Sequence, residues 1–396
     1  MNSLQKAKIA VSAENPSMSM PLKFEVSNQE IVKKMLEVSD LTKDESPRNL
    51  IKTIYLNIIN NLKNAGFSDL SIIRHDPIVS TEDNFDNLLF TPGNPGRSST
   101  YTRYVDEDHV LRTHTSASIP SILREYNLKY KGNIPHSTMI IPGTVYRRDV
   151  IDPKHLDVFH QIDIWELTEG RKTRSDLLKL VQTVFDAACP DAEMIVLEAI
   201  HPYTKEGIEV YAKIKESGQQ VEVLEAGLIH DEVLLKAGID PKKYGGLALG
   251  MGIERLIMAQ KELPDIRLIR SNDPRISKQM ENLSVFTSVS SMPAIIRDMS
   301  YCVSESEREE DVCEDIRIAF DQDSYLLEEV IIKNRINYKD LTEKVRDKLG
   351  IKEGQDNILA TIKLRHPDRT LNKQEANILY ERVYPLINKG LKGYSV

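Results

Sequence analysis

The stretch Val145–Trp165 reads VYRRDVIDPKHLDVFHQIDIW, and its two ends alternate in character from one residue to the next, as β-strands do. In the second run, Phe159, Gln161 and Asp163 fall on one face of the expected strand. The residues between the runs are polar and include Asp-Pro-Lys-His at 152–155. The stretch therefore predicts an antiparallel hairpin with a long loop.

One face of this hairpin would carry Arg147, Asp149, Phe159 and Gln161. These side chains make a poor hydrophobic core but a good nucleotide site. A guanidinium matches phosphate oxygens in pairs, and a flat aromatic ring can stack on a base. An exposed hairpin with one charged face is the other interpretation of this stretch when it is taken alone.

A second informative stretch, residues 244–258, reads YGGLALGMGIERLIM. It predicts a glycine-rich strand that leads into an apolar helix, with Glu254 and Arg255 just inside that helix. Glycine allows a ligand to approach the backbone closely. The pair Gly250 and Gly252 lacks the third glycine of a dinucleotide-binding fingerprint, and no GxxxxGK[ST] run occurs in the sequence, which excludes a P-loop.

Six runs in a fixed order carry a resemblance: RTHTS (112–116), VYRRD (145–149), FHQ (159–161), VEVL (221–224), GMGIERL (250–256) and PDIRL (264–268). Together they resemble class II aminoacyl-tRNA synthetases, with the two stretches above as motifs 2 and 3. More narrowly they resemble the phenylalanyl-tRNA synthetase α subunit and its single-chain organellar form. The resemblance covers roughly residues 46 to 275 and implies an α+β fold, in which helices flank an antiparallel sheet.

The composition is that of an ordinary globular protein of 396 residues, long enough for two or three domains. The net charge of −8 does not indicate nucleic-acid binding, so any RNA contact must come from local patches. Three cysteines without paired spacing favour a reducing compartment and a place in the core: Cys189, Cys302 and Cys313. We expect no transmembrane helix and no secretory leader, and hence a cytoplasmic protein.

The chain is predicted to have three parts: an N-terminal arm with a short helix (1–45), the catalytic domain (46–285) and a tRNA-binding domain (286–396). An amphipathic helix that opens at Ser46-Pro47 would be motif 1, which in the family lies at or near a subunit interface; simple packing in the core is the other interpretation. The protein would be a monomer or a homodimer.

The last part has the order β-α-β-β-α, which is ferredoxin-like. Its last helix is expected to begin near Asn372, with Glu375 three residues on as a capping pair. This part of the chain resembles the anticodon-binding domain of phenylalanyl-tRNA synthetases through PAIIRD (293–298) and RHPDRTL (365–371). Acidic residues dominate 301–330 and basic residues dominate 331–396, which fits contact with a phosphate backbone. A charged, solvated face is the alternative.

The resemblance implies that ATP and Mg²⁺ bind at the matching runs, through Arg147, Asp149, His155, Phe159, Glu222 and Arg255. Arg147 would hold the α-phosphate and Arg255 the γ-phosphate, and we expect these two to be the catalytic residues. Phe159 would stack on adenine with Asp149 nearby, and His155 would join at the phosphates. Glu222 would bind Mg²⁺, which prefers carboxylates and phosphate oxygens.

The amino acid is expected to contact His114, Ser116, Gln161, His201, Tyr203, Glu225 and Ala248. Here the chain departs from the phenylalanyl pattern. His201-Pro202-Tyr203 stands where those enzymes usually carry Phe-Pro-Phe, and Glu225-Ala226-Gly227 stands where they carry Gly-Cys-Gly. An imidazole and a carboxylate in the pocket suit a polar or charged group, so the substrate is phenylalanine or a related amino acid with a hydroxyl, amino or cationic side chain.

Three functions follow from these residues. The first is a synthetase that activates an amino acid with ATP and charges tRNA, with the amino acid, ATP and tRNA as partners and no membrane. The second is an adenylate-forming ligase of a biosynthetic pathway with another substrate or acceptor. The third is a non-catalytic nucleotide- or RNA-binding paralogue, which would have no physical need for Arg147, Phe159, Glu222 and Arg255 together.

Overall fold

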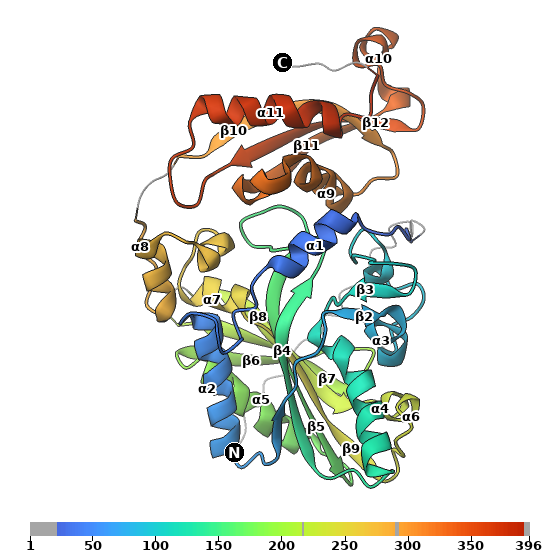
Figure 1. Ribbon diagram of the computed structural model, residues 1–396, viewed down its shortest axis with the longest axis vertical. Coiled ribbons are helices and arrows are strands. Elements are labelled where there is room, and N and C mark those ends of the chain that lie inside the picture. Colours follow the sequence, from blue (N-terminus) through green and yellow to red (C-terminus); the bar gives the residue numbers. More distant parts are fainter. Residues whose placement is uncertain (1–21, 216–217, 290–292, 392–396) are drawn as a thin grey trace, which may run out of the picture.

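The computed structural model describes residues 22–215, 218–289 and 293–391, so the arm expected at residues 1–21 lies outside the described residues. The largest sheet consists of β1 (Leu70–Ile72), β4 (Ser137–Tyr146), β5 (Val158–Glu169), β6 (Ala192–Glu198), β7 (Thr204–Ile214), β8 (Gln220–Ile229) and β9 (Tyr244–Gly252). Its order is β1-β4-β5-β9-β8-β7-β6, and all neighbours except the parallel pair β1–β4 are antiparallel (Figure 1). The predicted α+β class with a large antiparallel sheet is confirmed.

Helices cover both faces of this sheet. One face packs against α2 (Leu50–Asn64), α5 (Arg174–Ala188) and α7 (Glu254–Gln260), and the other against α4 (Ile119–Tyr130) and α6 (Asp231–Lys236). Alternate residues of the strands divide between these two cores, so that Ile140 and Ile164 belong to the first and Met139 and Trp165 to the second. Because helices cover both faces of the sheet, all ten residues of β4 are buried. A strand in such a sheet is apolar almost throughout.

Helix α2 buries its apolar stripe inside the chain. Ile51 and Ile58 are fully buried in the first core, so the helix packs in the core of its own chain, and a further place at a subunit interface stays a prediction. The helix begins at Leu50 rather than at Ser46, because the side chain of Asn49 caps it and accepts a hydrogen bond from the backbone N–H of Lys52 at 2.9 Å. Whether the protein is a monomer or a homodimer stays a prediction.

The predicted hairpin is confirmed. Strands β4 and β5 are antiparallel neighbours, Val145 lies opposite Phe159, and Tyr146 lies opposite Val158. Residues 147–157 form the long loop. Strand β4 begins at Ser137, well before the alternating run that revealed it, because its earlier residues are apolar on both faces and show no alternation.

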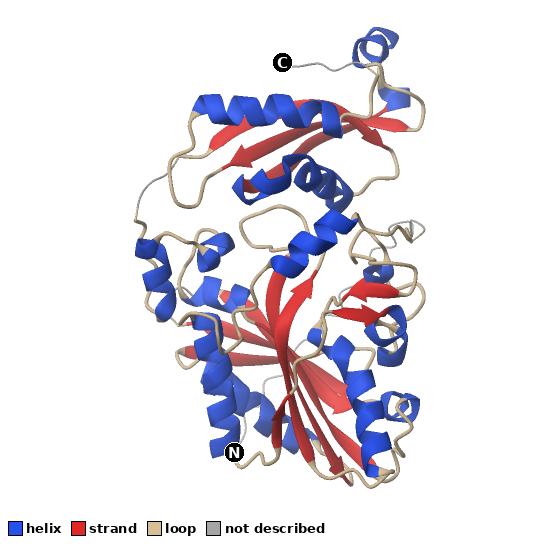
Figure 2. Cartoon of the chain, viewed as in Figure 1, coloured by secondary structure: helices blue, strands red, loops and turns tan. Residues whose placement is uncertain are grey.

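A second, smaller sheet follows. It contains β10 (Ile295–Ser304), β11 (Leu327–Asn337) and β12 (Gln355–Leu364) in the antiparallel order β10-β12-β11. Helices α9 (Glu309–Phe320) and α11 (Lys373–Ile387) share one core with it (Figure 2). This is the predicted β-α-β-β-α order, with the short α10 (Glu343–Leu349) added between β11 and β12. The predicted capping pair of Asn372 and Glu375 starts α11. The boundaries at 45 and 285 stay predictions.

The two parts of the molecule meet at the hairpin loop. Ile151 of this loop is buried in the core of the second sheet, and its carbonyl oxygen accepts a hydrogen bond from the N–H of Val330 at 2.9 Å. Nearby, the fully buried Arg103 pairs with Glu314 of α9. Burial alone would raise the pKa of Glu314, but the charge and hydrogen bonds of Arg103 lower it to about 2.

Several short elements complete the described chain: α1 (Gln29–Glu37), β2 (Ile78–Ser80), α3 (Thr81–Asn84), β3 (His109–Leu111) and α8 (Pro274–Ser277). Helix α3 follows β2 directly, and the side chain of Ser80 caps it. The three cysteines are free and buried, as predicted. None of the helices in the described part of the chain combines the length and the apolar run that crossing a bilayer would require.

Candidate active site

A cavity of about 720 Å³ lies where β5, β8 and β9 meet the hairpin loop. It brings together every predicted site residue except Ala248. The predicted residues that line it are His114, Ser116, Arg147, Asp149, His155, Phe159, Gln161, His201, Tyr203, Glu222, Glu225 and Arg255.

A row of acidic residues crosses the sheet beneath this cavity. In the strand register, Asp163 of β5 lies opposite Gly250 of β9, Gly250 lies opposite Glu225 of β8, and Glu225 lies opposite Glu209 of β7. A Cβ atom at Gly250 would lie 3.4 Å from Oδ1 of Asp163. The glycine therefore keeps the space between two carboxylates open for a ligand.

Arg147 is held at the start of the hairpin loop. Its Nε donates a hydrogen bond to the carbonyl oxygen of Thr113 at 3.0 Å. The guanidinium carbon lies 5.0 Å from the ring centroid of Phe159 and 5.6 Å from that of Tyr101. These cation–π contacts fix the guanidinium in the cavity wall, where it can receive an anion.

Two more basic side chains, His155 and Arg255, line the cavity. Nδ1 of His155 lies 2.8 Å from Oδ2 of Asp152, and this hydrogen bond, together with the charge of Asp149, raises the pKa of His155. Arg255 is exposed on the first turn of α7. With Arg147 they make a part of the cavity lining that suits a polyanion such as a triphosphate.

Glu222 lies at the rim of the cavity, near these cationic groups. Desolvation by the cavity walls raises its pKa, and so do the neighbouring charges of Glu225 and Glu209. A carboxylate that is surrounded by others in this way is suited to hold a divalent cation.

Another part of the cavity lining is organised by Asp163. Its carboxylate accepts hydrogen bonds from Oγ1 of Thr115 at 2.6 Å, Oγ of Ser116 at 2.5 Å and Nε1 of Trp165 at 3.1 Å. Burial nevertheless raises the pKa of Asp163. The side-chain oxygen of Gln161 accepts the N–H of Thr115 at 3.2 Å, so that Ser116 and Gln161 have fixed positions.

Aromatic rings form the wall beside Asp163. Tyr203 stacks on Trp165 at 5.9 Å between ring centroids and on His201 at 6.5 Å, while His114 stacks on Phe90 at 5.5 Å. Burial, and then the nearby charge of Arg147, lowers the pKa of His114 to about 3. Burial also lowers the pKa of His201. Both imidazoles are therefore neutral near pH 7.

The structure does not bring Ala248 to the cavity. Ala248 lies opposite Trp165 in the register of β5 and β9, is 1 % exposed and belongs to the core that contains α4. The fully buried indole of Trp165 occupies this part of the sheet face. The prediction that Ala248 contacts the amino acid is therefore not supported by its position.

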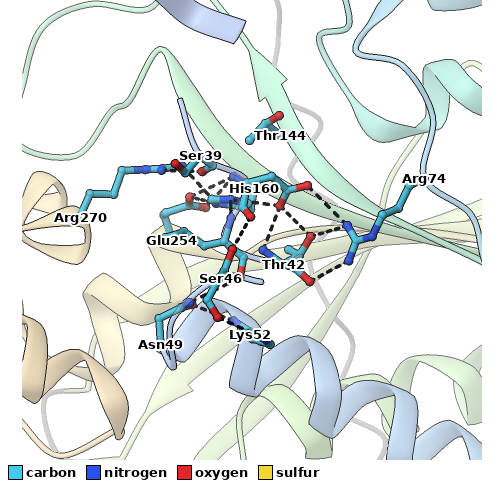
Figure 3. A network of polar contacts seen from close by, with 12 residues as sticks. Ser39, Thr42, Ser46, Asn49, Lys52, Arg74, Thr144, His160, Glu254 and Arg270 are labelled. Carbon is cyan, nitrogen blue, oxygen red and sulfur yellow. Dashed lines mark hydrogen bonds and ion pairs between the residues drawn. The ribbon is translucent and has the colours of Figure 1, made fainter. Parts of the chain in front are cut away.

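A buried polar network lies behind the cavity and joins the hairpin to the glycine-rich strand (Figure 3). Glu254 accepts hydrogen bonds from the backbone N–H of His160 at 2.9 and 3.0 Å, and the ring nitrogen Nδ1 lies 2.6 Å from its Oε1. The other ring nitrogen accepts the N–H of Leu41 at 2.9 Å, and Arg270 donates to the carbonyl oxygen of Ser39 at 3.0 Å. These contacts fix the positions of the residues that flank His160 and Glu254.

Other residues of the cavity wall were not predicted from the sequence. Tyr101 and Phe90 come from an irregular segment without periodicity, whereas Glu310 comes from α9 and Arg308 from its N-cap position, in the second part of the molecule. Asp163 could have been found, because it shares the strand face of Phe159 and Gln161.

Comparison with known proteins agrees with this geometry. Residues 37–280 match the family described as tRNA synthetases class II core domain (F). The phenylalanine–tRNA ligase, chloroplastic/mitochondrial, of Arabidopsis thaliana is 32 % identical over 367 residues, which cover 88 % of this chain and 78 % of that protein. The mitochondrial phenylalanine–tRNA ligase of Saccharomyces cerevisiae is 28 % identical over a match that covers 89 % of this chain and 88 % of that protein. A phenylalanine–tRNA ligase alpha subunit of Prochlorococcus marinus is 34 % identical over 50 % of this chain and 56 % of its own length. The chain therefore belongs to the class II tRNA synthetases, on the branch of the phenylalanine–tRNA ligases.

Proposed function

We propose that the protein activates an amino acid with ATP and transfers the aminoacyl group to tRNA. The observation that carries this proposal is that one cavity holds two kinds of lining. Three basic side chains, Arg147, His155 and Arg255, line the same cavity as the Asp163 cluster and its aromatic wall. A triphosphate and a small amino acid would meet between them.

In the first step, the carboxylate of the amino acid attacks the α-phosphorus of ATP, the aminoacyl-adenylate forms and pyrophosphate leaves. Arg147 would stabilise the charge that grows on the α-phosphate, and Arg255 would hold the γ-phosphate. Glu222 would hold Mg²⁺, which neutralises phosphate charge when bound. No side chain needs to form a covalent bond in this step, so positioning and electrostatic stabilisation account for the rate.

The amino group of the substrate fits the acidic row. The space above Gly250 lies between Asp163 and Glu225, where an ammonium group would find a carboxylate on each side. Ser116 and Gln161, which are held by the Asp163 cluster, would orient the amino acid there.

In the second step, a ribose hydroxyl of the terminal adenosine of tRNA attacks the carbonyl carbon of the adenylate, and AMP leaves. The basic residues of 331–396 would contact the phosphate backbone of the tRNA. The cytoplasmic location stays a prediction, because two of the relatives above carry organellar names.

The side chain of the substrate is the open part of this proposal. The relatives are named for phenylalanine, yet His201 and Glu225 both line the cavity beside Tyr203. A buried imidazole and a carboxylate favour a ring or chain that bears a hydroxyl, amino or cationic group, because polar partners left unpaired are costly. We therefore expect such a relative of phenylalanine to be the better substrate.

The experiment is amino-acid-dependent ATP–pyrophosphate exchange with the twenty standard amino acids and with hydroxylated, aminated and methylated phenylalanines. Exchange with one of them names the substrate, and charging of total tRNA with that amino acid tests the second step. Exchange without tRNA charging would favour a biosynthetic ligase. No exchange with any amino acid, in a protein that still binds ATP, would contradict the proposal.

A further inference from the structure

Two carboxylates face each other across β7 and β8 without a cationic partner. Glu209 and Glu225 are directly opposite in the register, where like charges destabilise a sheet. Among the described residues, no lysine or arginine forms an ion pair with either of them. Burial, and next the charge of Glu209, raises the pKa of Glu225. No ion pair therefore neutralises these two carboxylates, although the charge of Arg147 acts at longer range and lowers the pKa of Glu225.

A histidine with an unused ring nitrogen points at this pair. His201 is 9 % exposed, and its Nε2 makes no hydrogen bond with any residue that the structure describes. The nearest carboxylate oxygen, Oε2 of Glu225, lies 3.5 Å away, which is too long for a good hydrogen bond. A buried donor or acceptor that stays unpaired is unfavourable, so a native structure usually gives it a partner.

The three side chains converge on one point. One ligand atom from each of His201, Glu209 and Glu225 lies within 4.8 Å of the other two. An ion at the centre of such a triangle could bind all three atoms after small side-chain rotations, because Zn–N and Zn–O bonds are about 2.0–2.2 Å long. Glu222, the rim residue that we assign to Mg²⁺, is close enough for its charge to affect His201 but is not one of these three residues.

We propose that His201, Glu209 and Glu225 bind one divalent transition-metal ion, with Zn²⁺ as the best fit. One imidazole with two carboxylates is a donor set that suits Zn²⁺ and does not suit Mg²⁺, which prefers oxygen ligands alone. Three protein ligands leave a coordination position open. Because His201 and Glu225 line the cavity and Glu209 does not, the open position faces the bound amino acid.

The fourth ligand is then a hydroxyl or amino group on the side chain of the substrate. This second half of the inference rests on the proposed function, whereas metal binding itself does not. An ion at this place would explain why the wall carries an imidazole and a carboxylate, since an apolar ring could not complete the coordination.

The test is isothermal titration calorimetry of the full-length protein, stripped with a chelator, with zinc chloride alone and without ATP. We expect one Zn²⁺ per chain. His201→Asn and Glu209→Gln should each weaken binding by at least about 100-fold, since loss of even an outer-shell partner costs about 10–100-fold. His109→Asn is the matched control, because His109 is an exposed histidine beside Asp106 and should bind no ion of its own. Circular dichroism checks that each variant is folded, and either variant suffices if the other unfolds.

Absence of stoichiometric binding, or equal affinity in the wild type and both variants, would overturn the metal site. The substrate half is tested by exchange assays with Mg²⁺ and ATP, with and without one equivalent of Zn²⁺. Zn²⁺ should raise exchange with the hydroxylated or aminated phenylalanines at least tenfold over exchange with phenylalanine, and an equal effect on all would overturn the substrate contact. Loss of exchange with every amino acid, while Zn²⁺ still binds, would contradict the proposed function alone.

Discussion

Glu254 and His160 are joined twice, once through the backbone and once through the imidazole. Both carboxylate oxygens of Glu254 accept the N–H of His160, and Oε1 lies 2.6 Å from Nδ1 of the ring. Since Nε2 accepts the N–H of Leu41, the proton of the neutral ring must be on Nδ1. Glu254 precedes Arg255, and His160 stands between Phe159 and Gln161, so this contact positions residues in both parts of the cavity lining.

Glu254→Gln should therefore weaken both stability and exchange. The amide NH₂ of glutamine would replace a carboxylate oxygen that accepts a hydrogen bond from His160, so that two donors would face each other. We expect a loss of about 1–3 kcal/mol in the free energy of unfolding. Exchange activity should also fall at least about tenfold, because Arg255, Phe159 and Gln161 would shift from their positions in the cavity. Urea denaturation and ATP–pyrophosphate exchange measure the two effects. The exposed Glu125→Gln on α4 is the control; equal behaviour of the two variants would contradict this role.

Arg147→Lys should abolish most of the exchange activity and leave the fold intact. Lysine keeps the charge but cannot present the planar fork to a phosphate. Removal of one such preorganised donor costs about 10²–10³-fold in kcat, and we expect a fall of that size here. The exposed Arg171→Lys is the matched control. Exchange within threefold of the wild type would exclude Arg147 from phosphate binding.

The double variant His201→Phe with Glu225→Gly should shift preference toward phenylalanine. It removes the two polar groups that would be left unpaired beside a phenyl ring. We expect the ratio of kcat/KM for phenylalanine to that for the preferred polar amino acid to rise at least about tenfold. A steady-state exchange assay with both substrates measures the ratio, and an unchanged ratio would mean that neither side chain faces the substrate.

Arg103→Met should destabilise the junction between the two parts of the molecule. It removes one of two partners of the buried Glu314 and leaves Arg317 at 3.2 Å. Loss of a whole buried pair typically costs about 3–5 kcal/mol, and we expect a loss toward the lower end of that range. In the wild type the pKa of Glu314 is about 2, below its ordinary value of 4.5. The stability that this pair contributes is therefore complete above pH 4.5 and is lost as the pH falls through 2.

In the variant, burial still raises the pKa of Glu314 while only Arg317 and Arg148 lower it, so its pKa should rise above the wild-type value and acid should relieve part of the destabilisation. The gap in unfolding free energy between wild type and Arg103→Met should then be larger at pH 7 than at pH 4, by urea denaturation. A gap that does not depend on pH would mean that the charge of Glu314 does not cause the destabilisation of the variant. Replacing both residues with methionine should recover much of the loss.

Gly246→Ala should disrupt the centre of the large sheet. An added Cβ at Gly246 would lie 2.0 Å from the backbone oxygen of Glu166 on the neighbouring strand. Because backbone cannot move aside as a side chain can, we expect a loss of at least about 2 kcal/mol. Gly252→Ala is the control for stability, since nothing lies within 4 Å of the Cβ that it would add. Thermal unfolding of the two variants side by side gives the comparison.

Periodic signals in the sequence predicted much of this fold. The apolar stripe of α2, the alternation at the ends of the hairpin and the capping pair of Asn372 and Glu375 each depend on residues only a few positions apart. Such local patterns are sufficient to identify an element, although Asn49 shows that they do not fix where it starts. The resemblance of the matching runs then placed 12 residues that line the cavity.

What remained unpredicted depends on long-range packing. Arg103 and Glu314 are 211 positions apart, and no local pattern predicts that they pair. Phe90 and Tyr101 reach the cavity from an irregular segment, so no period marked them. Ala248 was placed by resemblance, but the position of the bulky Trp165 opposite it is set by how two strands and a helix pack together.

The insertion of Ile151 into the core of the small sheet limits how this protein can be dissected. A fragment that ends before β10 would leave Ile151 without its apolar surroundings and Arg103 without Glu314, with only Asp157 at 4.0 Å as a counter-ion. The C-terminal segment is therefore part of the minimal folding unit. Anyone who builds a chimera from this protein should transfer residues 147–157 together with the C-terminal segment, as one piece.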